Sequence, residues 1–185
     1  STRGQILFLT DTSAHGMSFI GAPFTFGFQK LGTNCGAVSP HCAVDISGII
    51  YWMSSDGFYM FDGTVRKMPC TVEDFVFDNI DATQLEQVYA ASNSAFGEVI
   101  WLYCSTASNQ IDRYVIFNYQ EKLWYTGSLD RSTWIDSGTY SLPYATKYDG
   151  SANTTVYVHE SGTDDDGSTM TSYIESGDFD IGDGD

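Results

Sequence analysis

Short apolar runs, each introduced by a glycine, recur along the chain. Gly4 precedes residues 6–9, Gly48 precedes 49–53, Gly97 precedes 99–103, and Gly138 more weakly precedes an alternating run at 140–144. The spacings from 4 to 48, from 48 to 97 and from 97 to 138 are 44, 49 and 41 residues. Repeats of about 40–50 residues with several strands each are typical of propeller blades. The chain is therefore predicted to be all-β, a partial β-propeller domain of antiparallel blades over residues 1–185.

A second apolar run follows a polar turn in most repeats. Residues 58–61 follow the turn at 54–57, residues 114–117 follow the loop at 105–112, and residues 156–158 follow the Asp-Gly pair at 149–150. Further turns are predicted at 62–63, at 166–167, and at 118–122 before a strand at 123–125. Asp and Gly favour turn conformations, so these patterns predict antiparallel hairpins.

Residues 72–91 depart from the strand pattern. Thr71 followed by Asp74 resembles a helix capping box, and Leu85, Val88 and Tyr89 stand at helical spacing. Two short helices are predicted, at about 72–78 and 82–91, as one insertion outside the sheets. Their apolar residues either pack on a blade edge or dock a partner.

Acidic residues outnumber basic ones by 24 to 8, which gives a formal charge of −16. Residues 149–185 contain ten of the acids and no Lys or Arg, with apolar residues interleaved. Nucleic-acid binding by phosphate neutralisation needs clustered Lys and Arg, and so does a polybasic membrane anchor. The composition excludes both of these functions. No apolar run approaches the ~18 residues of a membrane span, so no membrane insertion is expected.

Both ends of the sequence indicate a longer chain. Residues 1–4 have no Met and no signal-peptide pattern before the first apolar run, and residues 183–185 provide no closing element. The chain is therefore predicted to be truncated at both ends, a hypothesis that the intact mass of the native protein tests.

No pattern in the sequence points to a catalytic or cofactor-binding residue. Paired carboxylates for acid–base chemistry need different environments, but many of the acids precede Gly and are turn formers. His15, interpreted as a turn residue, lies far from His41 and from His159, which is expected at a strand end. No nucleophile elbow or phosphate-binding loop is present. Residues 54–58 match the box of sialidase propellers only loosely, since the Gly is one position early and the Trp is missing.

No metal site is predicted either. The runs at 164–167 and 178–185 are acidic, but neither has the Gly and Glu positions of a helix–loop–helix calcium site. The four cysteines (35, 42, 70 and 104) contain no C-x-x-C pair, which a zinc site favours. They are predicted to be free buried thiols, in line with an intracellular assembly route.

The tryptophans are the remaining candidates for a ligand surface, since indole rings can stack on sugars. Trp52 and Trp101 lie inside predicted strands, where packing between blades is the simpler explanation. Trp124 and Trp134 are less clearly assigned. Core packing is the favoured interpretation for the set.

Several stretches resemble the tail nozzle or hub proteins of short-tailed bacteriophages, also described as packaged-DNA stabilisation proteins. They are residues 19–24 (FIGAPF), 32–36 (GTNCG), 51–53 with 56–58 (YWM and DGF), 61–65 (FDGTV), 93–99 (NSAFGEV), 118–125 (NYQEKLWY) and 173–178 (YIESGD). The resemblance covers most of the chain, through motifs that are structural.

The resemblance implies a structural virion protein and no enzymatic activity. Members of that family are longer chains built around β-propeller domains, and they assemble as a ring, commonly a hexamer, below the portal and adaptor. The implied partners are copies of the chain itself, portal, adaptor and other tail proteins, and double-stranded DNA that passes without sequence-specific binding. The implied location is the virion tail, after assembly in the host bacterial cytoplasm.

In this role the acid excess has a physical use. An acidic channel wall repels the duplex and keeps it sliding, so replacing Asp164, Asp165 and Asp166 with Lys is expected to slow DNA ejection. Alternatively, these acids are solubilising outer turns. The alternative function is a secreted β-propeller module that binds or hydrolyses glycans, and a third is an all-β adhesion module that forms no ring.

Overall fold

The computed structural model describes residues 4–148, 150, 153–165 and 167–169. Over these residues the chain is mostly β, arranged in several antiparallel sheets. The same residues contain one α-helix, α1 (Glu73–Asn79), and one turn of 3-10 helix at Leu85–Gln87. None of the helices in this part of the chain is long and apolar enough to cross a membrane.

Four meander sheets follow one another along the chain, and each strand pairs with its neighbours in sequence. The first sheet contains β1 (Gln5–Leu9), β2 (Ser13–Phe19) and β3 (Phe26–Thr33). The second contains β4 (Ala43–Ile46), β5 (Ile49–Ser54), β6 (Gly57–Phe61) and β7 (Val65–Lys67). The third contains β8 (Tyr89–Asn93), β9 (Glu98–Tyr103), β10 (Arg113–Asn118) and β11 (Leu123–Ser128). The fourth contains β12 (Thr133–Ile135), β13 (Tyr144–Tyr148) and β14 (Thr154–Val158), and a ribbon of β15 (Asp164–Asp165) and β16 (Ser168–Thr169) follows it.

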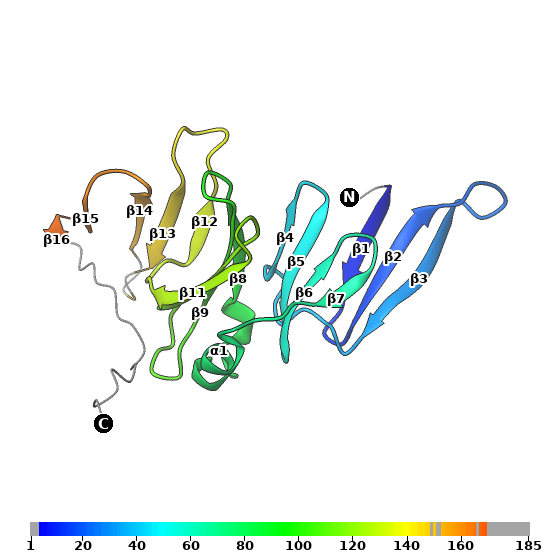
Figure 1. Cartoon of the computed structure of the whole chain (residues 1–185), viewed down its shortest axis with the longest axis horizontal. Coiled ribbons are helices and arrows are strands. Elements are labelled where there is room, and N and C mark those ends of the chain that lie inside the picture. The colour runs from blue at the N-terminus through cyan, green and yellow to red at the C-terminus, as the bar shows by residue number, and fades with distance from the viewer. Residues whose placement is uncertain (1–3, 149, 151–152, 166, 170–185) are drawn as a thin grey trace, which may run out of the picture.

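The second sheet lies between the first and the third and buries both of its faces (Figure 1). Toward the first sheet, the Trp52 indole N–H donates to the Cys35 carbonyl oxygen over 2.8 Å, and the Trp52 ring stacks on Tyr59. On the opposite face, the Phe58 ring centroid lies 4.8 Å from those of Trp101 and Trp124 in the third sheet. Successive side chains of a strand point to opposite faces, so a sheet between two others needs apolar residues at consecutive positions.

The third sheet packs in the same way between the second and the fourth. The Trp101 indole N–H donates to the Cys42 carbonyl oxygen of the second sheet over 3.0 Å. On the other face, Leu102 packs with Trp134 and Ala145 of the fourth sheet. The first and fourth sheets each bury one face in this stack, and their other faces carry exposed apolar residues.

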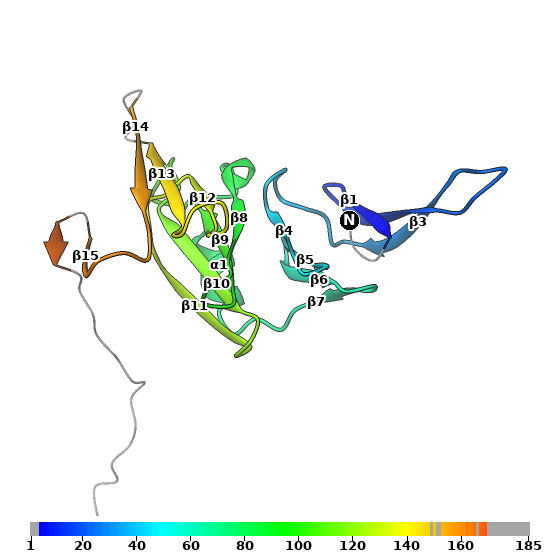
Figure 2. The ribbon, with the colours of Figure 1, turned by 90° about the horizontal axis from the view of Figure 1, so that it is seen from above.

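The first strands of the last three sheets lie side by side, as Figures 1 and 2 both show. Beside β4, the Ala90 N–H of β8 donates to the His41 carbonyl oxygen over 2.7 Å. Beside β12, the Ser92 hydroxyl of β8 donates to the Asp136 carboxylate over 2.7 Å. Strand β8 therefore lies between β4 and β12, and the sheets extend outward from this row.

The all-β, antiparallel prediction is confirmed. The strands predicted at 6–9, 49–53, 58–61, 99–103, 114–117, 123–125 and 156–158 fall within β1, β5, β6, β9, β10, β11 and β14. Asp56 and Gly63 lie in the predicted hairpin turns on either side of β6. The Asp-Gly turns at 149–150 and 166–167 each include a residue outside the described part of the chain. Gly48, Gly97 and Gly138 lie between the first and second strands of their sheets, whereas Gly4 precedes β1.

One predicted helix is present and the other is wrong. Helix α1 matches the helix expected at 72–78, although Val72 is its N-cap and no side chain caps it, so the expected capping box does not form. The helix expected at 82–91 is replaced by the short 3-10 turn and by β8. Strand β8 pairs with β9 over five residues, and this pairing stabilises the strand more than the helical spacing of three apolar residues favours a helix. The strand expected at 140–144 is also wrong, because β13 begins only at Tyr144.

Candidate functional site

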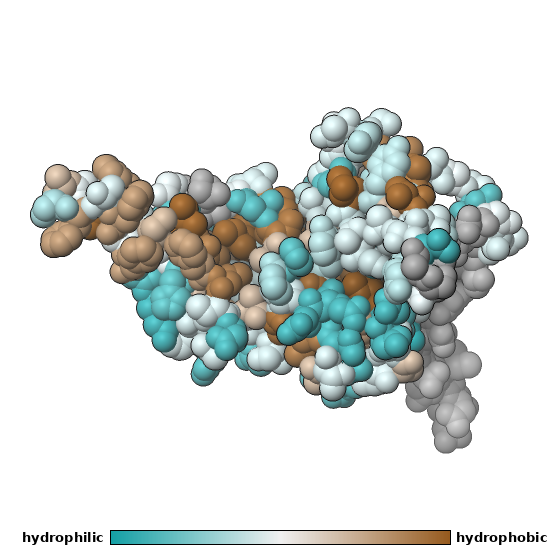
Figure 3. Space-filling model, turned by 180° about the vertical axis from the view of Figure 1, so that it is seen from behind, coloured by the Kyte–Doolittle hydropathy of each residue, from teal (hydrophilic) through white to brown (hydrophobic). Residues whose placement is uncertain are grey.

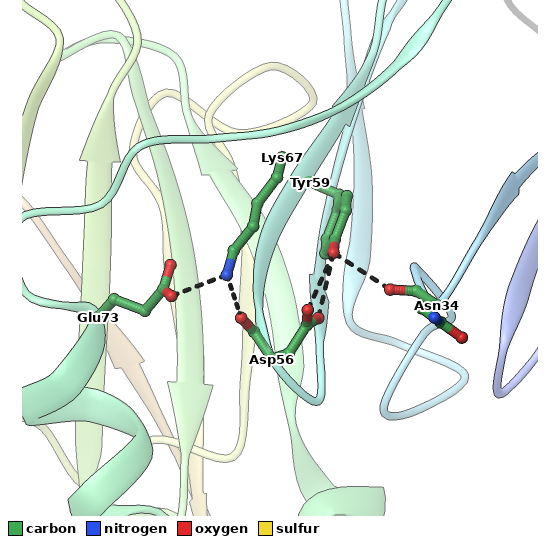
Figure 4. Close-up of polar contacts among 5 residues, drawn as sticks. All are labelled: Asn34, Asp56, Tyr59, Lys67 and Glu73. Carbon is green, nitrogen blue, oxygen red and sulfur yellow. Dashed lines mark hydrogen bonds and ion pairs between the residues drawn. The ribbon is translucent and has the colours of Figure 1, made fainter.

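A polar cluster joins the first two sheets to helix α1 (Figure 4). It consists of Asn34, Asp56, Tyr59, Lys67 and Glu73, and we refer to it as the Lys67 cluster. The Lys67 ammonium donates to Glu73 Oε1 over 2.8 Å and to the Asp56 carbonyl oxygen over 2.5 Å. The Tyr59 hydroxyl lies 3.1–3.2 Å from the Asp56 carboxylate oxygens and donates to the Asn34 carbonyl oxygen over 3.1 Å.

The local sequence makes room for this cluster at the turn between β5 and β6. Gly57 has φ +146°, and a Cβ at this position would lie 2.4 Å from Lys67 Cε. A side chain here would strain the backbone and displace Lys67 from its path across the turn to α1, so glycine suits this position. The Ser-Ser-Asp-Gly sequence therefore builds a structural turn at this place.

Both donors of the Lys67 cluster are held in their protonated forms. Burial is the largest cause that raises the pKa of Tyr59 to about 12, and the charge of Asp56 adds to it. The hydrogen bond to Glu73 raises the pKa of Lys67 above its ordinary value. A general base at neutral pH needs a pKa near the working pH, and neither group meets this condition. The cluster connects elements and is not equipped for proton transfer.

Two carboxylates meet where the third and fourth sheets end. Asn93, which is 2% exposed, donates through Nδ2 to Glu98 Oε2 over 3.4 Å and to Glu160 Oε1 over 3.2 Å. Burial, followed by the charge of Glu160, raises the pKa of Glu98. Carboxyl groups in unlike environments are what acid–base catalysis uses. The sequence carries no signal for this pair, because Glu98 and Glu160 belong to distant elements and neither is part of a catalytic motif.

The three histidines lie apart, in β2 (His15), before β4 (His41) and after β14 (His159), and form no common site. His15 is a strand residue of β2, so its assignment to a turn is wrong, and its Nε2 lies 2.9 Å from Ser13 Oγ. A nucleophilic Ser–His pair needs a third group that orients the imidazole, and among the described residues no carboxylate hydrogen-bonds His15. His159 follows β14 as expected, and its Nε2 accepts a hydrogen bond from Arg131 Nε over 3.1 Å.

The prediction of free thiols is confirmed, with Cys35, Cys42 and Cys104 buried and Cys70 half-buried. Burial raises the pKa of Cys70 and that of Cys104 to about 11. The thiolate is the form that attacks electrophiles and binds metals, and these two thiols stay protonated at neutral pH. Within the part of the chain that the structure describes, no three His, Cys, Asp or Glu side chains are placed to hold a metal ion. The acidic run at 178–185 lies outside the described residues.

All four tryptophans belong to the core. Trp52 and Trp101 are 0% exposed, Trp134 is 4% exposed and Trp124 is 9% exposed. The Trp124 indole N–H donates to the Pro69 carbonyl oxygen over 3.0 Å. The interpretation of the tryptophans as core residues is confirmed, and no indole face is open for a sugar ring.

The acidic stretch at 149–185 is described at Glu160, Asp164 and Asp165, and its other acids lie outside the described residues. Glu160 and Asp164 are exposed.

In comparisons with known proteins, no protein-family model matches the chain and no curated protein is similar to it. The function is therefore inferred from the fold, the charge and the placement of side chains.

Proposed function

We propose that the chain is a structural, non-enzymatic part of a phage tail nozzle, one sector of a β-propeller in a ring around the DNA channel. The observation that carries this proposal is the order of the sheets. Four meander sheets stack in chain order, and the first strands β4, β8 and β12 lie side by side. Propellers arrange successive antiparallel blades around a central axis in this way.

The side-chain chemistry supports a structural role. Aromatic residues, which make up 15% of the sequence, connect neighbouring sheets, as Trp52 and Trp101 do through ring packing and indole hydrogen bonds. The Lys67 cluster connects a turn to a helix and to a loop. These groups fix the sheets relative to one another, which suits a component that must hold its shape under load.

The acid excess suits a conduit for DNA. Contacts that neutralise phosphates hold a duplex in place, whereas an acidic wall repels it and allows it to move. The formal charge of −16 favours the second behaviour. In this role copies of the chain form the ring, a hexamer in the family that the sequence resembles. Portal, adaptor and other tail proteins are its neighbours, and double-stranded DNA passes through it.

The test replaces Asp164 and Asp165 of β15 with Lys in virions that carry the chain. If these acids face the lumen, the new ammonium groups bind passing phosphates, and DNA ejection slows several-fold while particle assembly is unchanged. Ejection is followed by dye fluorescence after receptor triggering. A matched variant, Asp78→Lys with Glu86→Lys, makes the same charge change at exposed positions in and after α1.

Slow ejection in the β15 variant alone supports a lumenal position for this segment. Unchanged ejection in both variants contradicts the lumenal position, and equal slowing in both contradicts a role specific to β15. Absence of the chain from purified virions contradicts the whole proposal.

A second candidate function, glycan hydrolysis, is favoured by the Glu98–Glu160 pair. In that case Glu98, with its raised pKa, is the proton donor, and Glu98→Gln abolishes hydrolysis while leaving the fold unchanged. A hydrolase screen over polysaccharides separates the two functions. The nozzle proposal expects no hydrolysis by the native chain.

A further inference from the structure

The outer face of the first sheet is mostly apolar and is uncovered, and its apolar part forms the brown area over β1, β2 and β3 in Figure 3. Strand register places six apolar residues on this face, with two polar ones, His15 and Lys30, in the row of Phe8; the apolar residues are Ile6, Phe8, Met17, Phe19, Phe26 and Phe28. The four phenylalanines are 43–72% exposed, and their rings pair across strands with centroid distances of 6.4 and 6.1 Å. Leu7 and Leu9 point the other way and pack against the second sheet. A contiguous exposed apolar surface of this kind marks an interaction site.

Comparison of β1 with β5 and β9 shows which kind of surface the outer face of the first sheet contacts. Strands β1, β5 and β9 each follow a glycine of similar positive φ: Gly4 (+80°), Gly48 (+85°) and Gly97 (+70°). Four residues after each glycine comes an aromatic residue, Phe8, Trp52 or Trp101. Both indoles face the preceding sheet and are 0% exposed, whereas the equivalent Phe8 is 43% exposed. The outer face of the first sheet is thus equivalent to the faces that pack against a preceding sheet.

The outer face of the fourth sheet, at the other end of the stack, is equivalent to faces that pack against a following sheet. Trp134 and Ala145 face the third sheet, so strand alternation places Ile135, Tyr144 and Val156 on the outer side. These three residues line a hollow. Ile135 is 57% exposed and Val156 is 61% exposed. This outer side is equivalent to the faces that cover a following sheet.

We propose that a second copy of the chain covers the outer face of the first sheet with the outer face of its own fourth sheet. This head-to-tail contact repeats the joint that the chain forms three times internally, a face of one sheet on the equivalent face of the next. Phe28, 72% exposed, projects from one face, and the hollow beside Tyr144 receives an apolar side chain on the other.

Charge disfavours one alternative, a contact between two fourth sheets. Residues 129–165, around the fourth sheet, carry six acids and two bases, a net of −4, so two fourth sheets repel each other. Residues 4–38, around the first sheet, carry one acid and one base and have no net charge. A head-to-tail contact closes into a ring or continues as a filament. The proposal uses the sheet stack alone and is independent of a tail function.

The test measures the mass of the full chain by light scattering over a range of concentrations, for the native sequence and for two variants. Phe28→Asp blocks the first sheet, and Val156→Asp blocks the fourth. We expect the native chain to associate increasingly with concentration and each variant alone to remain monomeric. A 1:1 mixture of the variants is expected to form a complex of two chains and no larger species, because one open face of each kind remains.

A control variant, Phe75→Asp, adds the same charge at a 55% exposed position on α1 and is expected to associate like the native chain. Circular dichroism and urea midpoints verify that all variants are folded. A native chain that stays monomeric overturns the proposal. Self-association of either blocked variant, or failure of the mixture to pair, also overturns it, because the contact would then join identical faces or other surfaces.

Discussion

The buried indole of Trp101 connects the third sheet to the second through one hydrogen bond, 3.0 Å long, to the Cys42 carbonyl oxygen. Replacing Trp101 with Phe keeps an aromatic ring but removes the donor and part of the volume at a fully buried position. We expect the free energy of unfolding to fall by about 2–3 kcal/mol, from the unsatisfied carbonyl and the cavity together. Urea unfolding followed by fluorescence of the remaining tryptophans measures the change.

The matched control for this prediction is Phe96→Leu, an aromatic replacement at a position that is 51% exposed. Surface substitutions of this kind change stability by about 0.5 kcal/mol or less. Equal losses in the two variants would show that the indole is not a joint between the sheets.

The raised pKa of Tyr59 predicts how the free energy of unfolding depends on pH. Its pKa is raised to about 12 in the folded chain, compared with about 10 for an unfolded tyrosine. Because the folded-state pKa is the higher one, the contribution of Tyr59 to stability is complete below about pH 10 and is lost as the pH rises toward 12. Tyr59→Phe removes this titration, so its unfolding free energy falls less steeply over the same range. Identical slopes in urea titrations of both proteins would contradict this assignment.

At the scale of elements, the connection between the first two sheets depends on Gly36. A Cβ at this position would lie 2.1 Å from the backbone carbon of Asp11, where no side chain can move aside. The backbone is held in place because the Ala37 N–H donates to the Thr10 carbonyl oxygen over 2.8 Å. We expect Gly36→Ala to cost about 3 kcal/mol or more and to loosen the first sheet. Hydrogen exchange at the β1 amides measures the loosening.

The control for Gly36 is Gly27→Ala, in the same sheet. A Cβ at Gly27 would first meet the side chain of Ile20, which is 57% exposed and free to move. We expect a loss of about 1 kcal/mol or less at this position. Comparable exchange rates in the two variants would show that the connection at Gly36 is not tight.

The sequence predicted best those elements whose pattern is local. Strands β5, β9 and β10 are long apolar runs that end in turn residues, and their alternation needs no partner to be recognised. The first strands, such as β4 and β12, have only four and three residues and carry too little pattern to stand out. The pattern of β8 predicts a helix because the pairing of β8 with β9 is information that the segment itself does not contain.

At the scale of the whole molecule, the candidate sites depended on contacts between distant residues. The sequence indicated buried tryptophans and free cysteines, because residue type alone favours the core for both. It could not indicate that Asn93 brings Glu98 and Glu160 together, since the loop after β14 approaches β8 only through the stacking of two sheets. The sequence also could not show which sheet faces lie at the ends of the stack, because the alternation of apolar and polar residues does not reveal which sheets have two neighbours.

The net charge predicts the behaviour of the whole chain toward DNA. With a formal charge of −16 and only 8 basic residues, we expect no binding to a labelled duplex by fluorescence anisotropy, even at low ionic strength. A lysine-rich peptide serves as the positive control. Binding that weakens as salt is added would reveal a basic surface that the charge distribution does not predict.

The most direct test of the nozzle role is cryo-electron microscopy of virions that carry this chain. We expect a ring of density at the tail, around the DNA channel, into which the stack of four sheets fits with β4, β8 and β12 in one row. Virions whose tail density does not accommodate this stack, or from which the chain is absent, would contradict a role in the tail nozzle.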